Sequence, residues 1–180
     1  MGKNVMPLLR TTIESGLTTD RIAGKTIVYR QASRAIVRRD DLILLLYTQR
    51  YRDYSLPGGG LEEDEDPVEG LIRELEEETG ARNIRNIQPF GSYEEYRSWY
   101  KPADSVLHMI SYCYTAEVDP HLGNTSMEGY ELRNGMQPVW ITLDEAIRYN
   151  QATMAGGPNQ GQSIERETYI LSLLRDSPST

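Results

Sequence analysis

The sequence contains very little cysteine or histidine. Cys113 is the only cysteine among 180 residues, so the chain can form neither an internal disulfide nor a cysteine-rich zinc cluster. His108 and His121 are the only histidines, which argues against a histidine-rich catalytic metal site. A metal centre built on either residue type is therefore not expected.

Long hydrophobic runs and a recognisable targeting signal are also missing. The longest apolar run, residues 42–47, is far too short to span a bilayer. The N-terminus has no long apolar segment, and Met6 stands where a myristoylation signal has Ser or Thr. We therefore expect no membrane association and a reducing, cytoplasmic location.

Positive charge is in deficit. The 19 lysines and arginines face 27 aspartates and glutamates, and the formal net charge is −8. This balance argues against a protein that binds duplex DNA, which needs a basic face to displace counterions. A polyanionic small molecule is still compatible with the charge if a metal ion offsets the repulsion. We therefore expect a small-molecule partner.

The hydrophobic pattern predicts an alternation of strands and helices within one domain of residues 1–180. Residues 1–24 are expected to form a weakly structured arm or a short strand lead-in, and 176–180 a tail. Three glycines in residues 54–60 predict a loop, and residues 119–135 a longer irregular one. The predicted strands cover residues 25–30, 33–38, 42–48, 84–100, 105–118 and 138–141, and the predicted helices 67–79, 143–150 and 163–175. This order predicts a mixed sheet flanked by helices.

The predicted helix over 67–79 has the clearest boundary signals. Asp66 is a good N-cap, Pro67 suits the first helical position, and Gly80 is a typical C-terminal stop. Apolar residues recur on one stripe of this helix, as expected for a helix that packs on a sheet. The stripe consists of Val68, Leu71, Ile72 and Leu75.

Glu74, Glu77 and Glu78 share an adjoining face of the same helix. Like charges at these spacings destabilise a helix by about 0.2–0.5 kcal/mol per pair. A hard divalent cation such as Mg²⁺ would remove that repulsion, because it prefers oxygen ligands. Glutamates alone are more typical of a solvated helix face. Their combination with the glycines just upstream favours a metal site beside a diphosphate-binding loop.

The segment Gly59 to Ala81 resembles the Nudix box of the Nudix hydrolase superfamily. The one soft departure is Ala81, where an aliphatic such as Ile or Val is common. The resemblance implies an α/β fold, the Nudix α/β/α sandwich with a mixed central sheet. The residues that carry it stand in the order Gly59-x5-Glu65-x7-Arg73-Glu74-Leu75-x-Glu77-Glu78-x-Gly80, preceded by Leu56-Pro57-Gly58.

The resemblance also implies roles for individual residues. Glu74, Glu77 and Glu78 match the family's ligands for Mg²⁺ or Mn²⁺, and Arg73 matches the arginine that orients one of them. Glu65 matches a box glutamate with a structural or outer-sphere role. The expected substrate-binding residues are Gly58, Gly59, Gly60 and Arg52, of which Gly58 could offer its carbonyl to the metal.

The general base stays open between the box and a later loop. Glu78 and Glu77 are the box candidates. In the loop, Glu131 is favoured over Glu128, although an exposed carboxylate without function explains either residue equally well. A group of aromatic residues could stack on a nucleobase but is more typical of sheet packing. This group is Tyr93, Tyr96, Trp99 and Tyr100.

The resemblance implies a Mg²⁺-dependent hydrolase that cleaves the pyrophosphate bond of a nucleoside diphosphate linked to another moiety. The substrate could be a nucleotide sugar, a dinucleotide or a (d)NTP. The alternative is a sensor or regulator with the same fold that binds a nucleotide without cleaving it. Retention of every box glutamate favours the enzyme. A homodimer is an expectation from the family alone.

Overall fold

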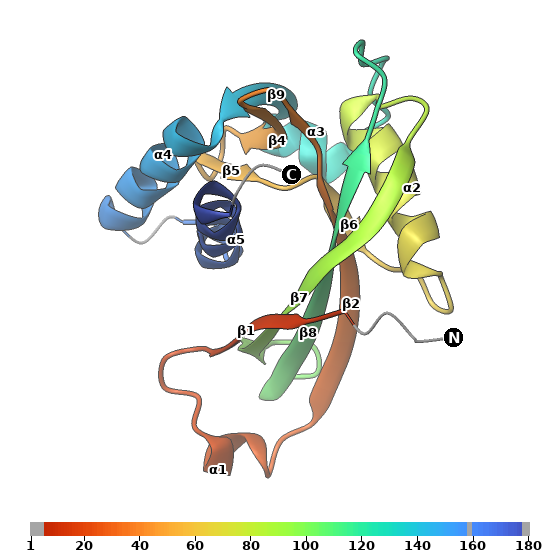
Figure 1. The fold of residues 1–180 in the computed structure, drawn as a ribbon. Helices are drawn as coiled ribbons and strands as arrows, with labels where there is room; N and C mark the ends of the chain where they lie inside the picture. Colours follow the sequence, from red (N-terminus) through yellow and green to blue (C-terminus); the bar gives the residue numbers. More distant parts are fainter. Residues whose placement is uncertain (1–5, 158–159, 178–180) are drawn as a thin grey trace.

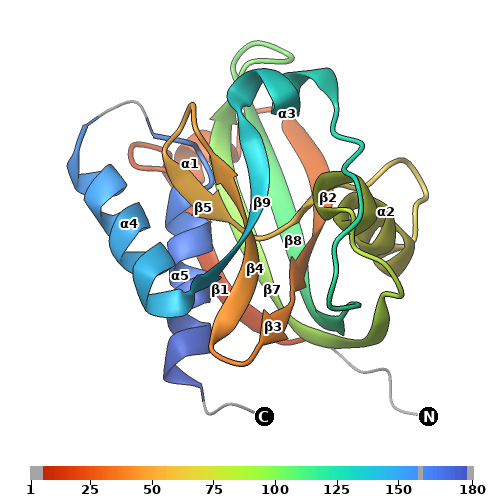
Figure 2. The same ribbon diagram turned by 90° about the horizontal axis from the view of Figure 1, so that it is seen from above.

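A computed structural model describes residues 6–157 and 160–177. The elements are β1 Leu8–Ile13, α1 Thr19–Ile22, β2 Ile27–Ile36, β3 Arg38–Arg39, β4 Leu42–Thr48, β5 Asp53–Ser55, β6 Gly58–Gly60, α2 Pro67–Thr79, β7 Arg85–Trp99, β8 Ser105–Glu117, α3 Gly129–Asn134, β9 Met136–Thr142, α4 Leu143–Ala155 and α5 Ile164–Asp176. One sheet has the order β1-β7-β8-β2-β6, and in the second β4 pairs with β3, β5 and β9. Helix α2 lies on one side of the sheets and α4 and α5 on the other (Figures 1 and 2).

The predicted α/β/α sandwich with a mixed sheet is confirmed. Strands β1 and β7 pair in parallel, as do β2 and β8, while the β7–β8 and β2–β6 pairs are antiparallel. The two strands predicted at 25–30 and 33–38 are one strand, β2. Its pairing with β8 continues from Ile27 to Ile36, so Gln31 and Ala32, between the two predicted strands, do not interrupt it.

Of the two alternatives for residues 1–24, a weakly structured arm or a short strand lead-in, the described part contains a strand and a short helix. Leu8–Ile13 forms β1, which adds to the edge of the sheet beside β7. The short helix α1 follows, with Thr18 as its N-cap. Residues 1–5 lie outside the described residues. Strand β1 is fixed because Tyr169 of α5 donates to the Leu9 carbonyl and Arg10 pairs with Glu165.

The predicted loop over residues 54–60 is largely strand. Gly58–Gly60 forms β6, paired with Ala32–Arg34 of β2. The unusual backbone conformation that the glycines predict is present at Gly58, whose φ is +140°. A Cβ atom at Gly58 would lie 2.0 Å from the Ser33 carbonyl oxygen. Glycine at this position therefore allows β6 to approach β2 closely.

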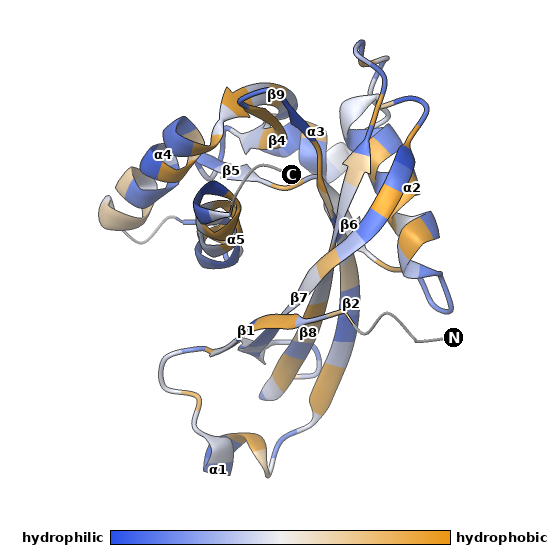
Figure 3. Ribbon diagram, in the orientation of Figure 1, coloured by the Kyte–Doolittle hydropathy of each residue, from blue (hydrophilic) through white to orange (hydrophobic). Residues whose placement is uncertain are grey.

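Helix α2 has the predicted bounds. The Asp66 side chain accepts from the N–H groups of Val68 and Glu69, and Gly80 ends the helix with φ of +69°. Leu71 and Leu75 are fully buried against the sheet, and α2 shows both hydrophobic and hydrophilic stretches in Figure 3. The polar part of the helix is thus free to carry its glutamates at the edge of the core.

The later elements run longer than predicted. Helix α4 continues to Ala155 rather than ending near residue 150, and its Thr142–Glu145 capping box is present. Residues 119–135 contain the short helix α3, which the turn signals in that segment did not predict. Helix α5 ends at Asp176, and residues 178–180 of the expected tail lie outside the described residues.

Replacing Gly58 with Ala is expected to destabilise the fold by about 2–5 kcal/mol. The new methyl group combines a strained φ with a clash against the backbone of Ser33. Gly60→Ala is the matched control, because a Cβ at Gly60 meets nothing within 4 Å. Urea unfolding of both variants measures the difference. Equal stability of the two variants would contradict the close approach of β6 to β2.

Candidate active site

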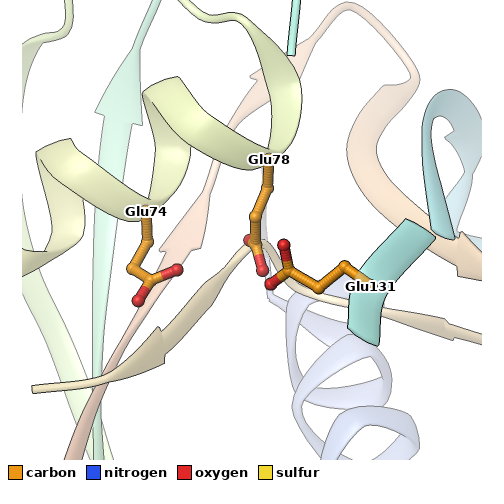
Figure 4. A group of neighbouring side chains, drawn as sticks. All are labelled: Glu74, Glu78 and Glu131. Carbon is orange, nitrogen blue, oxygen red and sulfur yellow. The ribbon is translucent and has the colours of Figure 1, made fainter. Parts of the chain in front are cut away.

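Three carboxylates from two distant segments meet at one point of the structure. Glu74 and Glu78 lie one turn apart on α2, and Glu131 faces them from α3 (Figure 4). One carboxylate oxygen from each residue lies within 4.8 Å of those of the other two. The exposed fraction is 3% for Glu78 and 4% for Glu131. The cluster therefore consists largely of buried negative charge.

Glu131 reaches the cluster because its loop is fixed to the C-terminal end of α2. The N–H of Gly123 donates to the Gly80 carbonyl at 2.6 Å, and that of Ser126 to the Glu77 carbonyl at 2.7 Å. These bonds satisfy carbonyl groups that a helix end leaves unpaired. Within α3, the N–H of Glu128 donates to Oε2 of Glu131 at 2.7 Å, which fixes the carboxylate.

The electrostatics of the cluster disfavour three ionised carboxylates. Burial raises the pKa of Glu78 well above its usual value, although the N–H of Gly58 donates to its Oε2 at 2.7 Å and opposes the shift. Burial also raises the pKa of Glu74, opposed by Arg73. A divalent cation among these oxygens would restore the ionised forms. The donor set, which is all oxygen, fits Mg²⁺ or Mn²⁺.

Arg73 organises the exposed side of the cluster. Its guanidinium forms two hydrogen bonds with Glu65, at 2.8 and 3.0 Å, and one with Glu74 at 2.9 Å. The hydrogen bonds from Arg73 lower the pKa of Glu65. Arg73 also contacts Glu77 at 3.4 Å, whereas no ion pair with Glu69 is present among the described residues. Glu65, which precedes α2, is therefore the main partner of Arg73.

The glycine strand β6 lies directly beside the carboxylates. A Cβ atom at Gly59 would lie 2.5 Å from the Glu74 carboxylate, so a side chain there would force this carboxylate to move. The Gly58 carbonyl accepts from Nη1 of Arg34 at 2.8 Å. All three glycines line a cavity of about 620 Å³ that Glu78 and Glu131 also border.

Basic and aromatic residues form part of the remaining wall of this cavity, beside polar and apolar residues and the carboxylate of Asp53. Three arginines border it, Arg34 from β2, Arg97 from β7 and Arg166 from α5, together with Tyr51 and Tyr130. None of these five residues was predicted from the sequence. Arg34 lies between Ala32 and Ile36 in β2, but Arg97 lies in a largely polar strand and Arg166 in a helix, so no pattern marked the three arginines together.

The other predicted site residues lie at some distance from this cavity or on its edge. Glu77 is not part of the three-carboxylate cluster, and its side chain is 36% exposed. Arg52 is exposed and borders a different cavity, of about 590 Å³, beside α4. Glu128 is exposed at the start of α3.

The four aromatic residues proposed for base stacking do not line the carboxylate cavity. Tyr93 is 1% exposed and packs in the core against Tyr169. Tyr96 stacks on His108 with ring centroids 4.3 Å apart, and Trp99 contacts Tyr100. Packing, the more common role of strand aromatics, accounts for these contacts.

The sequence matches the NUDIX domain family over residues 28–161. The chain therefore belongs to the Nudix family. Two solved structures share its fold, each covering 82% of this chain. A NUDIX hydrolase from Nitrosomonas europaea has a TM-score of 0.57, 18% identity and 90% of its own length covered. A MutT protein from Bacillus halodurans has a TM-score of 0.52, 19% identity and 83% of its own length covered.

Curated relatives match over shorter segments. A CMP-5'-(N-acetyl-N-hydroxy-3-aminopropyl)phosphonate hydrolase from Streptomyces rubellomurinus is 29% identical over 110 residues, covering 58% of this chain and 47% of that protein. An RNA pyrophosphohydrolase from Bartonella quintana is 40% identical over 53 residues, covering 29% and 27%. The chain thus spans less than half the length of these relatives. Among the described residues, no helix has the length and apolar character needed to cross a membrane.

Replacing Glu78 with Gln is expected to stabilise the metal-free protein at pH 7. Because the pKa of Glu78 is raised in the folded state, folded-state stability decreases as pH rises above the ordinary carboxylate range. A neutral amide does not ionise, so the variant avoids that loss and still accepts from Gly58. We expect its Tm in EDTA to exceed that of the wild type by about 2–4 °C, equivalent to about 1 kcal/mol.

The same variant should lose most of the rise in Tm that Mg²⁺ gives the wild type, since it lacks one anionic ligand. Glu76→Gln, on the exposed face of α2, is the control and should leave both quantities unchanged. Differential scanning calorimetry in EDTA and in Mg²⁺ measures both. A Glu78 variant with a lower Tm in EDTA and an undiminished response to Mg²⁺ would exclude a cation at this cluster.

Proposed function

We propose that this chain is a Mg²⁺- or Mn²⁺-dependent pyrophosphohydrolase. Its substrate is a nucleoside diphosphate linked to another moiety, as in a nucleotide sugar, a dinucleotide or a (d)NTP. The observation that carries this proposal is the approach of Glu74, Glu78 and Glu131 to within 4.8 Å, beside glycines that line a cavity. Three acidic residues next to such a cavity, two of them buried, are compatible with an anionic substrate when a cation lies between them.

The names of the curated relatives support this proposal. One acts as a hydrolase on a CMP-linked phosphonate, and the other is an RNA pyrophosphohydrolase. Both names describe hydrolysis of a nucleotide compound. The net charge of −8 favours a small nucleotide over duplex nucleic acid as the partner of this chain.

Glu74 and Glu78 are the proposed metal ligands with the best geometric support, and Glu77 is proposed from the family resemblance. The Glu77 side chain contacts Arg73 at 3.4 Å and is 36% exposed, on the same helix as Glu74 and Glu78. Arg73 acts as a positioning residue for Glu74. When bound, Mg²⁺ would neutralise charge on the phosphate oxygens and lower the pKa of a bound water.

Glu131 is the proposed general base. Its Oε2 accepts the N–H of Glu128 and its Oε1 accepts the hydroxyl of Tyr130, so the carboxylate is fixed and faces the cavity. From this position Glu131 would accept the proton of the water that attacks phosphorus. Glu78 is the alternative base within the box.

The diphosphate is proposed to bind at the glycine strand. Gly58, Gly59 and Gly60 border the cavity, with open space beside Gly60, and Arg34 donates from its Nη1 to the Gly58 carbonyl. A fixed arginine there would balance charge that develops on the leaving phosphate. Arg52 borders another cavity, so we propose that it contacts the substrate only when the substrate is long enough to extend into that cavity.

Further proposals come from the sequence and the family resemblance alone. We propose that residues 1–180 act as a single Nudix domain and that the protein works in the cytoplasm. A homodimer is proposed as its assembly. Size-exclusion chromatography with light scattering measures the assembly directly.

A panel of nucleotide sugars, dinucleotides and (d)NTPs tests the proposed reaction, with phosphate release read after addition of a phosphatase. We expect Mg²⁺-dependent hydrolysis of at least one substrate. Glu77→Gln and Glu131→Gln are each expected to reduce kcat by about 10²–10⁴-fold, while Tm changes little. Glu128→Gln is the matched control for Glu131, since it lies three residues away with an exposed side chain, and should retain activity within about threefold.

The outcomes separate the enzyme from its rival. Tight nucleotide binding without turnover of any substrate would favour the non-catalytic sensor. Wild-type activity in Glu77→Gln would remove Glu77 from the ligand set and leave the cluster of Glu74, Glu78 and Glu131. Equal loss of activity in the Glu128 and Glu131 variants would show that the assignment of the base is wrong.

A further inference from the structure

Unpartnered polar groups gather on one face of the main sheet. Among residues 6–157 and 160–177, three buried side-chain polar atoms have no hydrogen-bond partner: Nε of Arg34, Nε of Arg97 and Oγ of Ser111. On β8, Cys113 pairs with Arg34 and Leu107 pairs with Arg97, and both lie an even number of residues from Ser111. Side chains on alternate strand residues share a face, so all three point to the same side of the sheet.

The arginines on this face differ sharply in how their charge is balanced. Arg166 of α5 pairs with Glu95 at 2.6 Å and with Glu167 at 2.9 Å. Arg34 and Arg97 make no ion pair with any carboxylate in the part of the chain that the structure describes. A poorly hydrated cation without a counterion is costly, and burial lowers the pKa of both groups. The cavity wall therefore carries two positive charges that an anionic ligand would balance.

Arg34 and Arg97 lie toward opposite ends of the cavity. Arg34 contacts Gly58 beside the carboxylate cluster. The strand register places Arg97 level with Leu107, six residues along β8 from the level of Arg34. At the rise of a β-strand, these two levels are roughly 20 Å apart. One diphosphate held at the carboxylates is too short to reach both arginines.

The immediate partners of Arg97 are neutral. Its Nη1 lies 3.3 Å from Oε1 of Gln162, and its Nη2 lies 3.9 Å from the sulfur of Met109. These weak contacts hold the guanidinium at the cavity wall without neutralising it. Arg97 also borders a second cavity of about 430 Å³. Each of the two cavities is bordered by three arginines and three acidic residues, but only the first also contains the glycines of β6, so a substrate held at β6 reaches Arg97 through the first cavity.

We propose that Arg97 binds a second anionic group of the substrate, a phosphate or a carboxylate that lies well away from the scissile diphosphate. This inference rests on the proposed function, because it places the diphosphate at the carboxylates. Arg97 would then determine specificity, favouring nucleotides with an additional acidic group over neutral analogues. A planar guanidinium suits this role because it can bind phosphate or carboxylate through two hydrogen bonds.

Matched substrate pairs that differ in one acidic group test this proposal. UDP-glucuronate and UDP-glucose place a carboxylate or a hydroxymethyl group on the linked sugar. NADPH and NADH differ by a phosphate on the nucleoside. For at least one pair, kcat/KM of the wild type should be at least about tenfold higher for the more acidic member, as expected when a charged group gains a hydrogen bond.

Arg97→Gln should remove this preference, mainly by raising KM for the acidic member by about tenfold, and change the neutral member less than threefold. Arg97→Lys keeps the charge and should retain part of the preference. Arg34→Gln, at the carboxylate end of the cavity, should lower kcat/KM for both members of a pair by the same factor. Arg148→Gln, on the exposed face of α4, is the control for loss of a positive charge. Tm values of all four variants identify any that fail to fold.

The results separate this inference from the proposed function. No preference for an acidic member in either pair, or equal losses for both members in Arg97→Gln, would overturn it. If no substrate is hydrolysed, the proposed function fails, and calorimetric titration of the same pairs in EDTA decides the inference instead. The inference is supported if the wild type binds the acidic member more tightly and Arg97→Gln abolishes this difference. It is overturned if both members bind equally or neither binds.

Discussion

The active site depends on holding like charges together against their mutual repulsion. Glu74 and Glu78 approach each other because a helix places them one turn apart, but Glu131 comes from a segment more than fifty residues later. Two backbone hydrogen bonds to the end of α2 keep that segment in position. The free energy of the fold, rather than any attraction between the side chains, thus maintains a cluster that favours a cation.

An acidic protein can provide a site for anions when its charge is unevenly distributed. The cavity has carboxylates at one end and arginines along the sheet, although the chain as a whole carries a net charge of −8. Arg166 is neutralised within the core, where its two ion pairs connect α5 to the sheet. All three arginines border the cavity, but only Arg34 and Arg97 do so without an ion pair among the described residues.

Local signals made part of this structure predictable. Asp66 and Gly80 set the ends of α2 within the sequence itself, and the helical period then fixed the face that carries the glutamates. The sequence left Glu131 and Glu128 as alternatives in the later loop, because the choice depends on how this long loop contacts α2. The roles of Arg34 and Arg97 could not be predicted, since strand alternation gives two faces and only the packing of α5 decides which one borders the cavity.

Helix α5 begins after the segment that matches the family, yet one of its side chains binds the backbone just before the glycine strand β6. Oε2 of Glu167 accepts the N–H of Leu56 at 2.8 Å, two residues before Gly58, while Oε1 of the same carboxylate pairs with Arg166. One buried carboxylate thus joins the C-terminal helix to the backbone that leads into the cavity. Shared sequence ends at residue 161, but the smallest piece of chain able to keep the cavity intact extends further, through this last helix.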